Sequence, residues 1–145
     1  MTSALNIPVK LETKTNAPPS LQVVALLKEL QAMLNNLINK GEASSIDVRS
    51  LPMSPNDFKF LREFLGEGEV KAEVNVLGVT RIRETGVSGI WWVTHYNTYD
   101  EVIAELIEVT TLPVLLATQK LAVEEGLKLL EQRMVEKAVI KSNGG

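Results

Sequence analysis

The feature that most constrains the fold is a succession of strand-like segments between residues 69 and 110 with no clear helical segment between them. Residues 69–76 alternate apolar and polar side chains, which is typical of a half-buried strand, and further strands are predicted at 79–85, 90–96 and 102–110. The side chains expected to face inward on the first strand are Val70, Ala72, Val74 and Val76. Adjacent strands without regular strand–helix alternation favour an antiparallel sheet.

Helical patterns lie on both sides of this run of strands. Between residues 21 and 39, apolar side chains recur every three or four positions, with Ser20 placed to cap the start of the helix. Gly41 is placed to end that helix in a left-handed conformation. A shorter helix is predicted to begin at Ser54, and a long final helix at Pro113.

The chain is therefore predicted to be an α+β domain, in which an antiparallel sheet of about four or five strands has helices packed on one face. A short strand near residues 46–48 would complete the sheet. We expect a single domain over residues 20–140, a flexible N-terminal arm over residues 1–19, and a frayed C-terminus over residues 141–145.

Charge and hydropathy exclude two classes of partner. The 145 residues include 15 Lys and Arg against 18 Asp and Glu, a net charge of −3, so the chain has no basic field to attract nucleic acid. No apolar run approaches the roughly 18 residues that a membrane span requires. The first ten residues lack the charged start and apolar run of a secretory signal. We therefore expect a cytoplasmic protein that binds neither nucleic acid nor a membrane.

Cysteine is absent from the sequence, and histidine occurs once, at His95. These counts exclude Cys-ligated zinc, iron–sulfur clusters, a thiol nucleophile and a multi-histidine metal site within this chain, which leaves carboxylates as metal ligands. The sequence also lacks the glycine-rich phosphate-binding motifs and the nucleophile elbow. We expect no catalytic residue, no metal site and no cofactor.

His95 carries one alternative, in which the chain is a small enzyme or ligand-binding domain. Such a site would use His95 with Glu84 or Asp100, and it requires a concave pocket in which these side chains converge. Strand alternation places His95 on the same face as Trp91. A strand histidine whose ring is satisfied by a neighbour is the favoured interpretation, because the sequence ties no second reactive group to it.

Trp91 and Trp92 are adjacent in a predicted strand and therefore point to opposite faces of the sheet. One indole is expected in the core, and the other lies on the outer face unless both sides of the strand are covered. An exposed tryptophan is a typical anchor for a protein partner or, in a second alternative, for another copy of the chain across a twofold axis. Gly86 and Gly89, just before this strand, are predicted to bracket a bulge.

Three stretches, in order and spacing, resemble a known family. Residues 61–70 (LREFLGEGEV), 81–93 (RIRETGVSGIWWV) and 105–113 (ELIEVTTLP) are similar to its "LGxGEV", "IxET…GxWxV" and "xIEVxxxP" segments, and residues 51–55 fit its usual lead-in. The family is the HupH/HyaF type of hydrogenase expression and formation protein, in its conserved C-terminal region. The likeness covers about residues 51–130.

The resemblance implies a non-enzymatic accessory role in assembling nickel–iron hydrogenase. The chain would act as a chaperone or scaffold that holds a hydrogenase subunit precursor or another maturation protein. Because the family motifs fall on the tryptophan strand, we expect partner binding through Trp91, Trp92, Glu84, Gly86 and Gly89. Members of the family are often longer than this chain, which leaves open that two copies pair to form a larger surface.

Overall fold

A computed structural model describes residues 18–137, and the chain divides into two compact units, Met1–Thr111 and Leu112–Gly145. The frayed C-terminus predicted over residues 141–145 lies outside the described residues, as does the predicted arm except for its last two residues. The single domain predicted over residues 20–140 stays a prediction.

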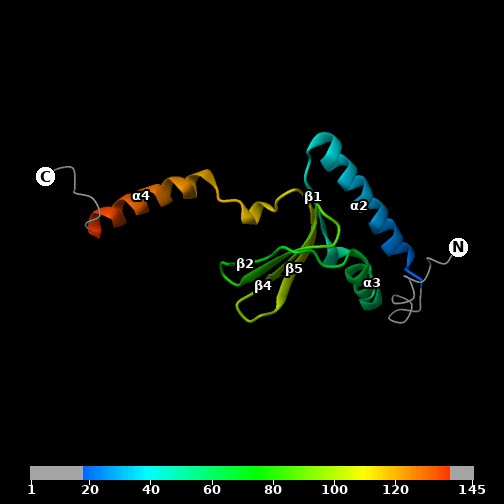
Figure 1. Cartoon of the computed structure of the whole chain (residues 1–145). Coiled ribbons are helices and arrows are strands. Elements are labelled where there is room, and N and C mark those ends of the chain that lie inside the picture. The colour runs from blue at the N-terminus through cyan, green and yellow to red at the C-terminus, as the bar shows by residue number, and fades with distance from the viewer. Residues whose placement is uncertain (1–17, 138–145) are drawn as a thin grey trace. The chain divides into compact units, whose positions relative to one another are not determined.

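The first unit contains a five-stranded antiparallel sheet with the order β1-β5-β4-β3-β2 (Figure 1). Its strands are β1 (Ser44–Asp47), β2 (Lys71–Asn75), β3 (Val79–Glu84), β4 (Ile90–Tyr96) and β5 (Val102–Val109). Every pairing is antiparallel, and β4, which carries both tryptophans, lies between β3 and β5. The predicted α+β class and antiparallel sheet are confirmed.

Two helices of this unit begin where the sequence predicts. Helix α2 (Leu21–Lys40) is capped by the Ser20 side chain, which accepts from the Val23 amide at 3.3 Å. Helix α3 (Pro55–Leu65) begins with a reciprocal capping box between Ser54 and Asp57. These local bonds satisfy amides that a helix start otherwise leaves without partners.

Helices α2 and α3 pack on one face of the sheet, and this face contains the hydrophobic core (Figure 1). The core cluster consists of Leu26, Leu30, Met33, Ile46, Val48, Leu61, Leu65, Ile90, Trp92, Ile107 and Val109. Strand alternation sends Trp92 and its cross-strand partner Ile107 into this cluster. We call this side the helix-covered face.

The opposite face of the sheet has a smaller buried centre, formed by Ile82, Trp91 and Val93, which lie outside the core cluster. Cross-strand neighbours on β5, including Leu106 and Glu108, are half-buried around it. We call this side the second face. Its perimeter mixes apolar and titratable side chains, whereas the helix-covered core is apolar apart from the indole N–H.

Two details of the strand prediction are wrong. Val70 and Val76 are 43% and 72% exposed, because β2 is an edge strand and its alternating side chains lie at the rim of the second face. Gly86 and Gly89 do not bracket a bulge within a strand but lie in the turn between β3 and β4. The register shift between β4 and β5 falls instead at His95/Tyr96.

In the second unit, the described residues 112–137 form a 3-10 turn, η3 (Val114–Leu116), and helix α4 (Lys120–Glu136). The long final helix therefore begins at Lys120 rather than at Pro113. Pro113 supplies no capping side chain to η3, and Ala117 then takes an extended conformation that interrupts the helix. Among the described residues, no helix is long and apolar enough to span a membrane.

Candidate functional site

Two of the sequence motifs meet in space where α3 ends and β3 turns into β4. The Gly86 amide donates to the Leu65 carbonyl at 2.8 Å, and the Gly68 amide donates to the Glu84 carbonyl at 2.8 Å. The Glu84 amide in turn donates to the Val70 carbonyl at 2.9 Å. The loop after α3 is thereby bonded to the end of β3 along its backbone.

This close approach requires glycine at two positions. A Cβ atom on Gly68 would lie 2.5 Å from the Thr85 carbonyl oxygen, and a Cβ on Gly86 would lie 2.9 Å from the Leu65 carbonyl oxygen. Any side chain at either position would push the two backbones apart. The glycines of these motifs therefore have a structural explanation.

Thr85 and Gly89 fix the turn itself. The buried Thr85 hydroxyl donates to the Ile90 carbonyl at 2.9 Å and accepts from the Val87 amide at 3.2 Å. Gly89 has a φ of 95°, a conformation that favours glycine. The turn is thus a built element that sets where β4 begins.

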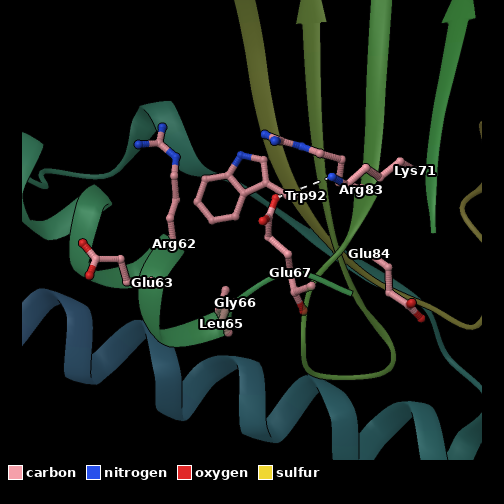
Figure 2. Close-up of a pocket in the computed structure, with 10 residues that line it drawn as sticks. Arg62, Glu63, Leu65, Gly66, Glu67, Lys71, Arg83, Glu84 and Trp92 are labelled. Carbon is pink, nitrogen blue, oxygen red and sulfur yellow. Dashed lines mark ion pairs between the residues drawn. The ribbon is translucent and has the colours of Figure 1, made fainter. Parts of the chain in front are cut away.

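A cavity of 420 Å³ opens beside this junction (Figure 2). Its wall comes from the C-terminal end of α3, the loop after it, and strands β2, β3 and β4. Six of its lining residues are charged: Arg62, Glu63, Glu67, Lys71, Arg83 and Glu84. We call it the junction cavity; the balanced charges beside an indole suit it to polar side chains of both signs.

Trp92 forms the aromatic wall of the junction cavity and ties three elements together. Its indole N–H donates to the Glu105 carboxylate at 2.7 Å, and the Arg62 guanidinium lies 5.4 Å from the indole ring centroid. Arg62 also pairs with Glu105 at 3.4 Å. Because these residues come from β4, β5 and α3, the cluster holds the helix against the sheet at the cavity.

The remaining charges of the junction cavity are unequally satisfied. Lys71 pairs with Glu67 at 3.9 Å. Among residues 18–137, the Arg83 guanidinium and the Glu84 carboxylate have no ion-pair partner, and the Oε2 atom of Glu63 is buried without a hydrogen bond. Arg83 is the cross-strand partner of Trp92, and Figure 2 shows its side chain directed toward the indole. The cavity therefore offers an unpaired cation.

Of the two alternatives for the paired tryptophans, the structure has the one in which both sides of the strand are covered and not the one with an outward indole, because each indole is 5% exposed. Trp91 lies in the buried centre of the second face and donates from its indole nitrogen to the Thr110 carbonyl at 3.0 Å. Both sides of the central strand are covered at this point. Self-association through an outer tryptophan at a twofold axis is therefore not supported, because neither indole is exposed.

The histidine site is not assembled in the structure. Thr80 is the cross-strand partner of His95, and its hydroxyl forms a hydrogen bond of 2.7 Å with the Nδ1 atom of the imidazole. Glu84 lies opposite Trp91 at the other end of β3, and Asp100 lies in the turn before β5. Of the three cavities described, none is lined by His95 or Asp100. The interpretation of a satisfied strand histidine agrees with this geometry.

Several residues of the site were missed by sequence reasoning. Arg62, Arg83 and Glu105 lie inside the family motifs, and Lys71 directly follows one of them, but the motifs alone do not predict these four residues as part of a site. The only signal in the sequence is that each charge lies inside or directly after a family motif. Their convergence depends on the strand register, which pairs Arg83 with Trp92.

Comparisons with known proteins agree on one family. Residues 21–136 match the family described as HupH hydrogenase expression protein, C-terminal conserved region. A solved structure, the hydrogenase expression protein HupH from Thiobacillus denitrificans ATCC 25259, is 34% identical in sequence and superimposes with a TM-score of 0.78. The likeness covers 82% of this chain and 99% of that one.

Two curated relatives are longer than this chain and match it over only part of their own length. The hydrogenase expression/formation protein HupH of Rhizobium leguminosarum bv. viciae is 30% identical over 115 residues, which are 79% of this chain and 39% of the relative. The hydrogenase expression/formation protein HoxQ of Azotobacter vinelandii is 41% identical over 69 residues, 48% of this chain and 24% of the relative. The chain thus matches well under half the length of these relatives.

Proposed function

The chain belongs to the family of HupH hydrogenase expression proteins, whose C-terminal conserved region it carries, and on that premise we propose that it is a cytoplasmic, non-enzymatic accessory protein of nickel–iron hydrogenase maturation. It binds a hydrogenase subunit precursor or another maturation protein as a chaperone or scaffold. The names of its relatives support an accessory role in hydrogenase expression and formation. The binding function and its location on the molecule are our proposal.

The observation that carries the proposal is the unpaired Arg83 guanidinium beside Trp92 in the junction cavity. A guanidinium next to an indole binds a carboxylate of a partner in a bidentate manner, while the aromatic wall excludes water from one side. Glu84, which also lines the cavity, accepts from the partner's donors. The partner segment is therefore one that carries an acidic side chain flanked by donors.

The residues predicted from the motifs divide between contact and support in this proposal. Trp92 and Glu84 line the junction cavity and contact the partner directly. Gly86 and Gly89 shape the turn that holds the cavity wall, and the buried Trp91 anchors the same strand from the second face. The partner surface is thus the cavity and its rim rather than a protruding indole.

A capture experiment tests the proposal. The tagged chain is expressed in cells that make a nickel–iron hydrogenase, and bound proteins are identified by mass spectrometry. We expect recovery of a hydrogenase subunit precursor or a maturation protein, and a loss of roughly tenfold or more in binding of that purified protein to Arg83→Glu. Because Arg83 has no ion pair to lose, the variant should keep the parent's melting temperature.

Lys59→Glu is the matched control, since Lys59 is an exposed cation on α3 outside the junction cavity and its reversal changes the net charge equally. The control should bind as the parent does. Equal binding by parent, Arg83→Glu and Lys59→Glu would remove the junction cavity from the proposal, and failure to recover any hydrogenase-related protein would remove the role itself.

A further inference from the structure

The outer edge of β2 is free of any strand between residues 18 and 137. Backbone bonds join Glu84 to Val70 and Val76 to Gly78, and these bonds fix the alternation along β2. Ala72 and Val74 direct their amides and carbonyls toward β3. The corresponding groups of Lys71, Glu73 and Asn75 therefore point away from the sheet, ready to pair with another extended segment.

This edge lacks the usual structural protections against pairing. Residues 71–75 contain neither proline nor glycine, and the register between β2 and β3 is regular along its whole length. The only features of β2 that disfavour pairing with another strand are the charged side chains of Lys71 and Glu73. These two charges are opposite in sign and two residues apart, so they repel or attract an incoming strand according to its own charges.

We infer that two copies of the chain pair through their β2 strands, antiparallel and centred on Ala72, to form one continuous ten-stranded sheet. This inference is independent of the partner-binding role proposed above. A twofold axis perpendicular to the sheet brings Lys71 of each copy opposite Glu73 of the other, and Val70 opposite Val74. The outward amides and carbonyls of Lys71 and Glu73 then bond across the interface.

Charge selects this register over the neighbouring ones. Outward-facing groups must meet outward-facing groups, so odd-numbered residues pair with odd-numbered residues. Centring the pair on Lys71 or on Glu73 would place identical charges opposite each other, which destabilises the pairing. Centring it on Ala72 makes two opposite-charge pairs and places that small side chain on the axis. The sequence of β2 is thus complementary to itself.

The mass of the protein in solution tests the inference. Light scattering over concentrations up to about 1 mM should show the mass rising from that of one 16.0 kDa chain to that of two. In hydrogen exchange by NMR, the amides of Lys71, Glu73 and Asn75 should become slower as the dimer forms. A mass of one chain at every concentration would overturn the inference.

A charge exchange distinguishes this interface from any other. Lys71→Glu alone and Glu73→Lys alone each place like charges opposite each other, and each should weaken the dimer roughly tenfold. The double variant Lys71→Glu/Glu73→Lys restores opposite charges and should restore the dimer. It cannot restore the internal pairs of Lys71 with Glu67 and of Glu73 with Arg81, so recovery can come only from the contact between copies.

Glu29→Lys, on the exposed side of α2, is the control for charge reversal and should leave the dimer unchanged. A dimer that is indifferent to all three edge variants would overturn the inference, because it would use another surface. A chain that stays single but whose β2 amides are protected by a purified hydrogenase subunit precursor would also overturn it and assign the edge to that protein.

Discussion

The two faces of the sheet bury adjacent tryptophans to the same extent by different means. On the helix-covered face, Trp92 lies under α2 and α3, and its N–H is held by a carboxylate that also binds Arg62. On the second face, Trp91 lies in a small cluster of β3 and β4 side chains, and its N–H is held by a main-chain carbonyl.

The difference teaches where a site can form on this scaffold. On the helix-covered face, the network of Trp92, Glu105 and Arg62 side chains joins α3 to the sheet, and the junction cavity lies beside it at the end of that helix. On the second face, a main-chain carbonyl accepts from the Trp91 N–H, and none of the three cavities described is lined by Trp91. The candidate site therefore lies at the edge of the helix cover, and breaking the two faces separately should have different consequences.

The largest expected effect comes from emptying the helix-covered core. Ile107 is fully buried against Trp92, whereas its neighbour Leu106 is half-buried on the second face. Ile107→Ala should lower the free energy of unfolding by about 2–5 kcal/mol, and Leu106→Ala by roughly half as much, because less of its surface leaves water on folding. Urea unfolding followed by tryptophan fluorescence measures both. Equal losses would show that the two faces are packed alike.

The next effect concerns the junction that bonds the loop after α3 to the sheet. Gly68→Ala places a methyl group against the Thr85 carbonyl oxygen and should cost about 1–3 kcal/mol, with weaker partner binding at the junction cavity. Gly126→Ala, in α4, meets nothing within 4 Å and should cost nothing or stabilise its helix. Thermal unfolding of the two variants decides whether the motif glycine is structural.

A smaller effect separates the two indole N–H groups. Trp92→Phe removes a hydrogen bond to a charged acceptor, worth about 1.5–3 kcal/mol, while Trp91→Phe removes one to a neutral carbonyl, worth about 0.5–1.5 kcal/mol. Both variants keep an aromatic ring in place. The free energy of unfolding should therefore fall more for Trp92→Phe than for Trp91→Phe, as measured by urea unfolding. A larger loss for Trp91→Phe would contradict our account of the two faces.

Local patterns predicted much of this fold. The Ser20 and Ser54 caps and the apolar stripe of α2 depend on neighbours within a few residues, and the structure confirms them. The inward face predicted for residues 69–76 holds for Ala72 and Val74, which are half-buried, but not for Val70 and Val76, because alternation does not say how far a sheet or its cover extends. Strand order is a tertiary property, and it placed β2 at the edge.

The candidate site was less predictable for the same reason. The motifs predict Glu84 and Trp92 as site residues, and both line the junction cavity, but the motifs do not predict the unpaired Arg83. An arginine in a strand looks solvated until its cross-strand partner is known, and only the register shows that Arg83 lies opposite Trp92. The burial of both indoles could not be predicted from the sequence either, because the residues that cover the two sides of β4 are distant from it in sequence.

The smallest expected effect compares a carboxylate from each face and depends on pH. Burial raises the pKa of the Glu108 carboxyl above its ordinary 4.5, an effect that the charge of His95 opposes. The folded state therefore binds this proton more tightly than the unfolded chain, so stability from this group is lost as pH rises from about 4.5 through the higher folded pKa. Glu108→Gln should unfold at a higher temperature than the parent at pH 7 and at the same temperature near pH 4.

Glu105→Gln, on the helix-covered face, is the matched variant and should do the reverse. Its carboxylate is held by the Trp92 N–H and by Arg62, so neutralising it weakens both contacts and lowers the melting temperature at pH 7. The Asp57 carboxyl, whose pKa is lowered chiefly by the backbone amide of Ser54, titrates alike in all three proteins and cancels from the comparison. If Glu108→Gln were less stable than the parent at pH 7, the ionised Glu108 carboxylate would be stabilised by contacts on the second face, as the Glu105 carboxylate is on the helix-covered face.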